Sequence, residues 1–161
     1  MVKTFKNANI DFTCNHCGWH ITSQPMVSGV KHRNHCPICL YSRHMDLFHA
    51  GDRLCACKGM MAPVGLTLKR CTDKYQGNHT GELMLVHRCL DCGALSINRI
   101  AADDDPVTLL MIFEHSITWK THALARGEMN DIDLLNDEDR YVLHLRLFGD
   151  VFAPIPISVC A

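Results

Sequence analysis

Short apolar runs separated by turn residues dominate the first hundred positions of the chain. The runs 64–68 and 82–88 are each short and bounded by turn signals, a pattern typical of β-strands. The segment between them, 73–81, is rich in glycine and polar residues. We therefore expect the two runs to pair as a hairpin, with a loop over 73–81.

Beyond residue 104 the pattern becomes helical. The sequence Asp103-Asp104-Asp105-Pro106 combines an acidic N-cap with a proline in the first turn, which predicts the start of a helix. Gly127 predicts its end. The apolar positions in between share one helix face: Leu110, Phe113, Ile117 and Leu124.

The last part of the chain carries a second cap signal. Asn136-Asp137-Glu138-Asp139 precedes the apolar run 141–148, and this order favours another helix. The leucines of that run also recur at every second position, so a strand remains an alternative. Pro154 and Pro156 predict an irregular tail after Gly149.

Composition narrows the class of protein. The hydrophobic fraction of 47% and the charged fraction of 20% are ordinary for a globular protein, whereas ten cysteines and eleven histidines are not. The first residues lack the apolar core of a signal peptide, and no apolar run approaches the roughly 20 residues of a membrane span. We therefore expect a cytoplasmic protein without membrane contact, whose cysteines bind metal and do not form disulfides.

Charge is distributed unevenly. Residues 1–100 contain six Lys and six Arg against five Asp and one Glu, an excess of six positive charges. Residues 101–161 contain one Lys and three Arg against eight Asp and three Glu, an excess of seven negative charges. This division predicts that residues 1–100 bind a polyanion. Two ordinary solvated surfaces would give the same charge distribution.

The strongest chemical signal is a pair of Cys-x-x-Cys motifs. Cys14 and Cys17 are followed, after 18 residues, by Cys36 and Cys39. This spacing is typical of a four-thiolate zinc site, whereas a redox-active pair would open a helix in a βαβ unit. Lys31, Arg33, Arg43 and nearby backbone N–H groups are expected to offset the negative charge of the thiolates.

A second metal site is expected downstream, with a less certain ligand set. Cys89 and Cys92 form a third Cys-x-x-Cys motif, and Cys57 is the natural third ligand. His87 lies two residues before Cys89, on the same face of an extended strand, and is favoured narrowly as the fourth. Cys55 is the alternative.

At this point the chain resembles the RNHCP domain family of small bacterial proteins. The resemblance rests on Arg33-Asn34-His35-Cys36-Pro37 and covers roughly residues 8–104. It continues through these motifs: Cys39–Asp46, Gly51–Arg53, Cys57–Pro63, His87–Cys89, Cys92-Gly93 and Asn98–Asp104. The family is regarded as zinc-binding, and its pattern implies Cys57, His87, Cys89 and Cys92 for the second site, with Cys55 and Cys71 outside it.

These patterns predict an α+β fold with two zinc-ribbon-like β units. The units would form a domain over 1–104, followed by an acidic, mainly helical extension over 105–161. Two Zn²⁺ ions are expected, because metal binding replaces the hydrophobic core that small ribbons cannot build. No organic cofactor is expected.

The leading functional hypothesis is a non-enzymatic module that binds RNA or the ribosome, more than duplex DNA, or else a protein partner. Trp19 and Tyr41 could stack on unpaired bases, and the candidate phosphate contacts are Lys31, Arg33, Arg43, Arg53, Arg88 and Arg99.

Two alternatives to this hypothesis remain. The protein could be a zinc-dependent enzyme or redox protein with an open second metal site, where His44, Asp46 or Asp91 would serve as base. It could also be a structural subunit of a larger assembly.

Overall fold

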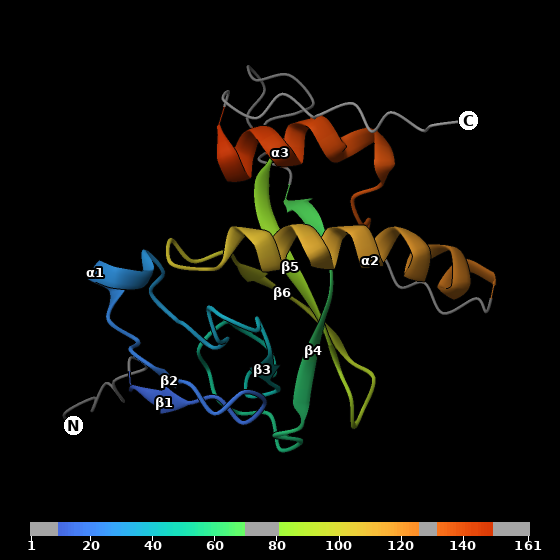
Figure 1. The fold of residues 1–161 in the computed structure, drawn as a ribbon. Helices are drawn as coiled ribbons and strands as arrows, with labels where there is room; N and C mark the ends of the chain where they lie inside the picture. Colours follow the sequence, from blue (N-terminus) through green and yellow to red (C-terminus); the bar gives the residue numbers. More distant parts are fainter. Residues whose placement is uncertain (1–9, 70–80, 126–131, 150–161) are drawn as a thin grey trace, which may run out of the picture.

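A four-stranded antiparallel sheet forms the centre of the protein (Figure 1). The computed structural model describes residues 10–69, 81–125 and 132–149. The strand order is β3–β4–β5–β6. The strands are β3 (Ser42–Arg43), β4 (Met60–Lys69), β5 (Glu82–Cys89) and β6 (Leu95–Arg99).

The N-terminal unit lies to one side of this sheet. It contains a two-stranded sheet of β1 (Phe12–Thr13) and β2 (His20–Ile21), followed by the short helix α1 (Pro25–Ser28). With the helices described below, the chain has the α+β architecture with two small antiparallel sheets that the sequence predicts.

The β4–β5 pairing confirms the two strand predictions. Met61 lies opposite Cys89 at one end of the pair, and Lys69 lies opposite Glu82 at the other. The register shifts between Pro63 and Gly65, which marks a bulge in β4. The predicted loop, apart from its last residue, lies outside the described residues.

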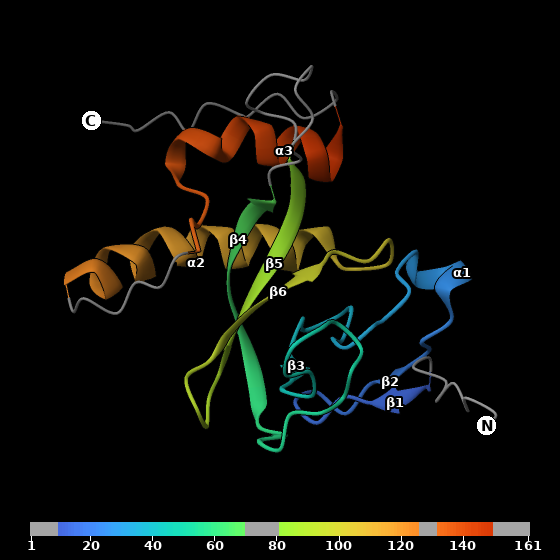
Figure 2. The ribbon, with the colours of Figure 1, turned by 180° about the vertical axis from the view of Figure 1, so that it is seen from behind.

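The longest helix covers one face of the sheet (Figures 1 and 2). This helix, α2 (Pro106–Ala125), begins at the predicted proline and contacts β4. Phe113 is buried against the sheet, and Leu110 and Ile117 are partly buried beside it. The side chain of Leu124 and the predicted stop at 127 lie outside the described part. No helix among the described residues is both long and apolar enough to span a bilayer.

The second predicted cap is also present. Asn136 accepts the backbone N–H of Glu138, and Asp139 accepts the N–H of Asn136, which forms a capping box. The 3-10 turn η1 (Asp137–Asp139) leads directly into α3 (Arg140–Phe148). The helix interpretation is therefore confirmed, and the strand alternative is wrong. The tail from 150 onward lies outside the described residues.

Both halves of the chain contribute to one hydrophobic core. Its buried members come from the sheet, from both C-terminal helices and from the loop after Cys39: Leu40, Leu66, Leu85, Leu109, Phe113, Leu135 and Leu143. Arg146 of α3 also donates to the carbonyl oxygen of Gly81 at the start of β5, at 2.6 Å. The helical segment thus completes the core of the sheet, while the division at residue 104 stays a prediction.

A second, smaller cluster lies in the N-terminal unit. Its buried members are Cys14, Ile21 and Cys36, with Phe12 and Cys39 packed against them. Three of these five side chains are cysteines. The hydrophobic contacts of this unit are therefore largely made by the thiols themselves.

Candidate metal centres

The four cysteines with the zinc-ribbon spacing lie together. The sulfur atoms of Cys14, Cys17, Cys36 and Cys39 all lie within 4.8 Å of one another. The Cys14–Cys39 and Cys17–Cys36 sulfur distances are both 3.6 Å. Two sulfurs bound at 2.3 Å to one tetrahedral zinc would be about 3.8 Å apart. This group therefore fits a tetrahedral metal ion. We call it centre 1.

Each Cys-x-x-Cys motif forms the same backbone turn. The carbonyl oxygen of its first cysteine accepts an N–H four residues later, from Gly18, Leu40 and Gly93 respectively, at 2.9–3.0 Å. All three donors have positive φ, at 76°, 59° and 76°. Glycine adopts this conformation freely, whereas a leucine does not. Leu40 is fully buried in the main core, and this packing offsets its strain.

Backbone N–H groups aim at the sulfur atoms in these turns. The N–H of Trp19 lowers the pKa of Cys17. Burial raises the pKa of Cys36 and of Cys39, so those thiols resist ionisation without a nearby cation. A bound cation would reverse this preference, because thiolates are the metal-binding form.

A second group of four ligand atoms lies where β4 begins and β5 ends. It consists of His44, Cys57, Cys89 and Cys92, whose ligand atoms lie within 4.8 Å of one another. The Cys57 and Cys89 sulfurs are 3.6 Å apart, and His44 Nδ1 lies 3.3 Å from the sulfur of Cys92. One imidazole and three thiols match a Cys3His metal site. We call this group centre 2.

Two thiols of centre 2, those of Cys57 and Cys89, differ in pKa. Although burial works in the opposite direction, N–H groups of Cys92 and Asp91 lower the pKa of Cys89 to about 7. The N–H of Gly59 favours the thiolate of Cys57, yet the neighbouring thiols raise its pKa to about 11. One thiolate therefore forms readily at neutral pH, and a cation is needed to ionise its neighbours.

The structure corrects the prediction that His87 is the fourth ligand of this group. His87 lies in the middle of β5, opposite Pro63 of β4 and Ser96 of β6. Two residues along a strand span about 7 Å, so sharing a face with Cys89 does not bring the ring to the same metal. The alternative, Cys55, is buried and lies outside both groups. Cys71 is outside the described residues.

His44 reaches centre 2 through strand pairing. Arg43 of β3 lies opposite Met60 of β4, and the N–H of His44 donates to the carbonyl oxygen of Gly59 at 2.8 Å. Cys57 is two residues before Gly59, so this register places the imidazole beside its thiol. The useful signal in the sequence was the histidine that follows the second Cys-x-x-Cys motif by five residues.

Replacement of Gly59 by alanine should weaken centre 2 selectively. A Cβ at this position would lie 2.9 Å from the sulfur of Cys89 and 2.6 Å from Asp91 Oδ2, closer than real contacts allow. We expect Gly59→Ala to speed release of one of two bound metal ions to a chelator, because the Cys89 thiolate must shift. Gly18→Ala is the comparison at centre 1. An added Cβ there meets nothing within 4 Å, although the φ of 76° disfavours alanine. Release of both ions at unchanged rates would contradict this expectation.

His87 instead anchors the loop of centre 1 to the sheet. Its Nε2 hydrogen-bonds the carbonyl oxygen of Leu40 at 2.7 Å, and its Nδ1 accepts from Asn98 Nδ2 at 2.9 Å. Burial lowers the pKa of His87 to about 3, so the ring is neutral. With Nδ1 accepting, Nε2 carries the proton and donates to Leu40. The Asn98 carbonyl in turn accepts from Asn34 Nδ2 at 3.0 Å.

This chain of hydrogen bonds joins the two centres. Leu40 directly follows Cys39 of centre 1, and His87 lies two residues before Cys89 of centre 2. The ring that was expected to bind metal therefore holds the two metal-binding segments against each other.

The arginine of the Arg33–Pro37 motif is also a buried structural residue. Its two terminal nitrogens donate to both carboxylate oxygens of Asp103, at 2.8 and 2.6 Å, and one of them lies 3.3 Å from Asp104. Asp104 also accepts from His35 Nε2 at 2.8 Å and from the N–H of Ala101 at 2.7 Å. The prediction that Arg33 contacts nucleic acid is therefore wrong, because its side chain is fully buried and its terminal nitrogens bind carboxylates. Its role in offsetting the thiolates stays a prediction.

The other candidate phosphate contacts are more accessible, to different degrees. Lys31 and Arg43 are exposed, and Arg88 is half-buried. Arg99 pairs with Glu82 at 3.0 Å, and the Arg53 Nε lies 4.0 Å from an oxygen of Asp46. These residues keep their predicted role as an untested proposal.

The two candidate stacking residues differ. Trp19 is 59% exposed. The ring of Tyr41 already stacks on His16, with centroids 3.6 Å apart and planes at 3°. Of the two, Trp19 has the ring surface open to a partner.

Comparison with known proteins identifies the family of the chain. The family model described as the RNHCP domain matches residues 9–110, a segment that contains both groups of metal ligands. No curated protein and no solved structure was found to match. Because the match spans more than half of the 161 residues, the chain belongs to the RNHCP domain family.

Proposed function

We propose that the protein is a non-catalytic module folded around two Zn²⁺ ions. The observation that carries this proposal is the pair of complete donor sets, four thiols in centre 1 and three thiols with one imidazole in centre 2. Soft thiolate donors in tetrahedral arrangements favour zinc over magnesium, calcium or manganese. Centre 1 would use Cys14, Cys17, Cys36 and Cys39, and centre 2 would use His44, Cys57, Cys89 and Cys92.

The same donor sets argue against a zinc enzyme. A catalytic zinc keeps one coordination position for water and needs a nearby base. His44, one of the expected bases, belongs to the ligand group of centre 2. Asp46, another, accepts the N–H groups of Gly51 and Arg53 at 2.7 and 3.1 Å. Asp91, the third, lies beside Cys89, but four protein ligands at each ion would leave no free position for a water molecule to activate.

Single-stranded RNA is the partner we propose for this module. The first 100 residues carry an excess of six positive charges. Zinc with four thiolates has a formal charge of −2, and zinc with three thiolates and one histidine has −1. Subtracting these three charges still leaves a positive excess of three on the part of the chain that holds both centres. Exposed Trp19 adds a ring on which an unpaired base can stack.

The salt dependence of binding tests the RNA proposal. The full-length, zinc-loaded protein is titrated into fluorescently labelled single-stranded RNA, and anisotropy is measured from 50 to 200 mM salt. With three phosphate contacts, we expect the logarithm of the association constant to fall with a slope of about −2 against the logarithm of salt concentration. Duplex DNA of the same length is the control and should bind more weakly. Absent or salt-insensitive RNA binding would contradict the proposal.

A further inference from the structure

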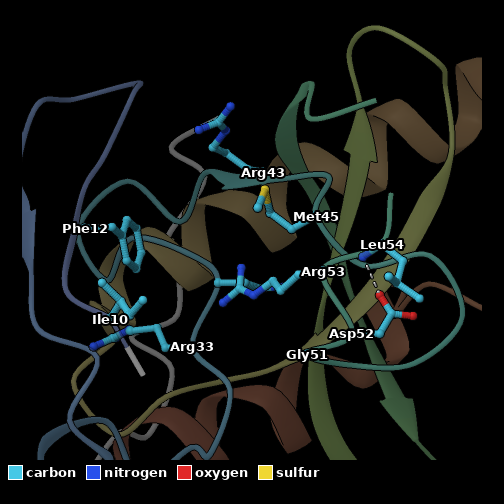
Figure 3. Close-up of a pocket in the computed structure, with 10 residues that line it drawn as sticks. Ile10, Phe12, Arg33, Arg43, Met45, Gly51, Asp52, Arg53 and Leu54 are labelled. Carbon is cyan, nitrogen blue, oxygen red and sulfur yellow. Dashed lines mark hydrogen bonds between the residues drawn. The ribbon is translucent and has the colours of Figure 1, made fainter. Parts of the chain in front are cut away.

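A cavity of about 450 Å³ lies between the N-terminal unit and the loop after β3 (Figure 3). Its apolar walls come from Ile10, Phe12, Met45 and Leu54. Two arginines, Arg43 and Arg53, line the same space. Figure 3 shows the side chain of Arg53 extending across the cavity toward Phe12. A volume of this size falls within the range of small-molecule sites, about 300–1,000 Å³.

The backbone holds Arg53 in an unusual conformation. Its φ is 56°, a region that a long side chain rarely occupies. The carboxylate of Asp46 accepts its N–H at 3.1 Å, and Lys58 Nζ donates to its carbonyl oxygen at 3.1 Å. Residues kept in such conformations by their surroundings cluster at binding sites. Among the described residues, no hydrogen bond reaches the terminal nitrogens of Arg53, so they remain available to a ligand.

Asp52 also lines the cavity, but its carboxylate binds backbone N–H groups and forms no ion pair with Arg43 or Arg53 among the described residues. The carboxylate of Asp52 accepts four backbone N–H groups, from Leu47, Phe48, His49 and Leu54, at 2.8–3.0 Å. These bonds hold the pKa of Asp52 well below its usual range and fold the loop around it.

Arg33 also lines the cavity, with its side chain fully buried. Its terminal nitrogens bind Asp103, but its buried Nε has no hydrogen-bond partner among the described residues. Buried donors of this kind are usually satisfied, by protein, water or ligand.

We propose that this cavity binds a nucleoside monophosphate unit, with the base against Phe12 and the phosphate at Arg53. Arg43, whose guanidinium donates to the carbonyl oxygen of Lys58 at 3.4 Å and points away from Arg53 in Figure 3, adds positive charge at the rim. Guanidinium groups bind phosphate with paired hydrogen bonds, and an aromatic ring offers a stacking face to any base. The unit comes either from a free nucleotide or from an unpaired position in RNA. The inference rests on the proposed function only for the RNA source.

The test uses the zinc-loaded, full-length protein and three probes. Adenosine 5′-monophosphate, a single-stranded hexa-adenylate and inorganic phosphate are each titrated by calorimetry. Arg53→Asn removes the guanidinium and puts in a residue that tolerates positive φ. Arg43→Gln removes the second cation. Lys69→Ala removes an equal charge from the exposed end of β4, at a residue outside the candidate phosphate contacts, and serves as the matched control. Zinc content and thermal unfolding establish that each variant is folded.

We expect the monophosphate to bind more tightly than inorganic phosphate. Arg53→Asn should weaken it about tenfold or more and Arg43→Gln less, whereas Lys69→Ala should change it by less than about twofold. Hexa-adenylate binding about tenfold tighter than the monophosphate would identify RNA as the source. Equal affinities would identify the free nucleotide.

Two results would overturn the cavity proposal. One is no binding of the monophosphate at millimolar concentration. The other is an equal loss in all three variants, which would indicate general charge attraction and leave the RNA function standing. Conversely, if the monophosphate binds through Arg53 but hexa-adenylate and longer RNA do not, the proposed RNA function fails and the cavity remains a nucleotide site.

Discussion

Chelation of the metal ions is expected to unfold residues 11–41 while the helix-covered sheet stays folded. Within residues 11–41 the local buried cluster is Cys14, Ile21 and Cys36, so Ile21 is its only buried aliphatic member, while Leu40 packs in the main core. The main core, by contrast, has seven buried apolar residues, six of them outside 11–41. Structural zinc supplies about 10–16 kcal/mol of binding free energy, which in such a unit is folding free energy. Amide hydrogen exchange with and without chelator measures the loss of backbone protection in each segment.

Two variants sharpen that experiment. Cys17 is exposed, so Cys17→Ser changes little packing and removes one ligand of centre 1. It should reproduce the loss of protection over 11–41 without chelator. Cys55→Ser alters a buried cysteine outside both groups and should keep both ions and the protection. If residues 11–41 stay protected after complete metal removal, the unit folds through its own contacts and the zinc account of it is wrong.

Arg33→Ala should be the most damaging substitution outside the metal ligands. It removes the guanidinium that pairs with Asp103 and with the buried Asp104. Removing one partner of a buried ion pair costs about 3–5 kcal/mol, because the remaining charge is uncompensated. Urea unfolding of the zinc-saturated protein measures the loss. Arg33→Lys should recover only part of it, since an ammonium cannot make the paired bonds to Asp103.

The exposed arginine on β6 supplies the comparison. Arg99 pairs with Glu82 at the surface, and pairs of this kind contribute about 0–1 kcal/mol. Arg99→Ala should therefore lower the free energy of unfolding by less than about 1 kcal/mol. Equal losses for Arg33→Ala and Arg99→Ala would show that the buried network does not stabilise the fold as proposed.

The sequence predicted those structural features, metal-binding turns and helix caps, that are determined by residues close together in the chain. The Cys-x-x-Cys motifs pointed to all four members of centre 1 and to Cys89 and Cys92 of centre 2, and Cys57 was added as the natural third ligand. The acidic residues before Pro106 and the cap at Asn136 located both C-terminal helices. In each case a local turn or cap carries its own residue signature.

Long-range pairing explains what the sequence did not reveal. His44 becomes a candidate ligand only because β3 pairs with β4, and that register is not readable from either short segment. Arg33 was interpreted as a surface cation, and its partners lie 70 and 71 positions away along the chain. The shared core was missed for a similar reason. Periodicity shows which face of α2 is apolar, but not that Leu40 and Leu66 meet it.

The zinc content of two histidine variants tests the central claim most directly. Native mass spectrometry of the purified protein should show two zinc ions. His44→Ala should retain one, because centre 2 loses its nitrogen ligand. His87→Gln should retain two, since glutamine can still donate to Leu40 and His87 is not a ligand. One ion in His87→Gln with two in His44→Ala, or no zinc in the unmodified protein, would contradict the account.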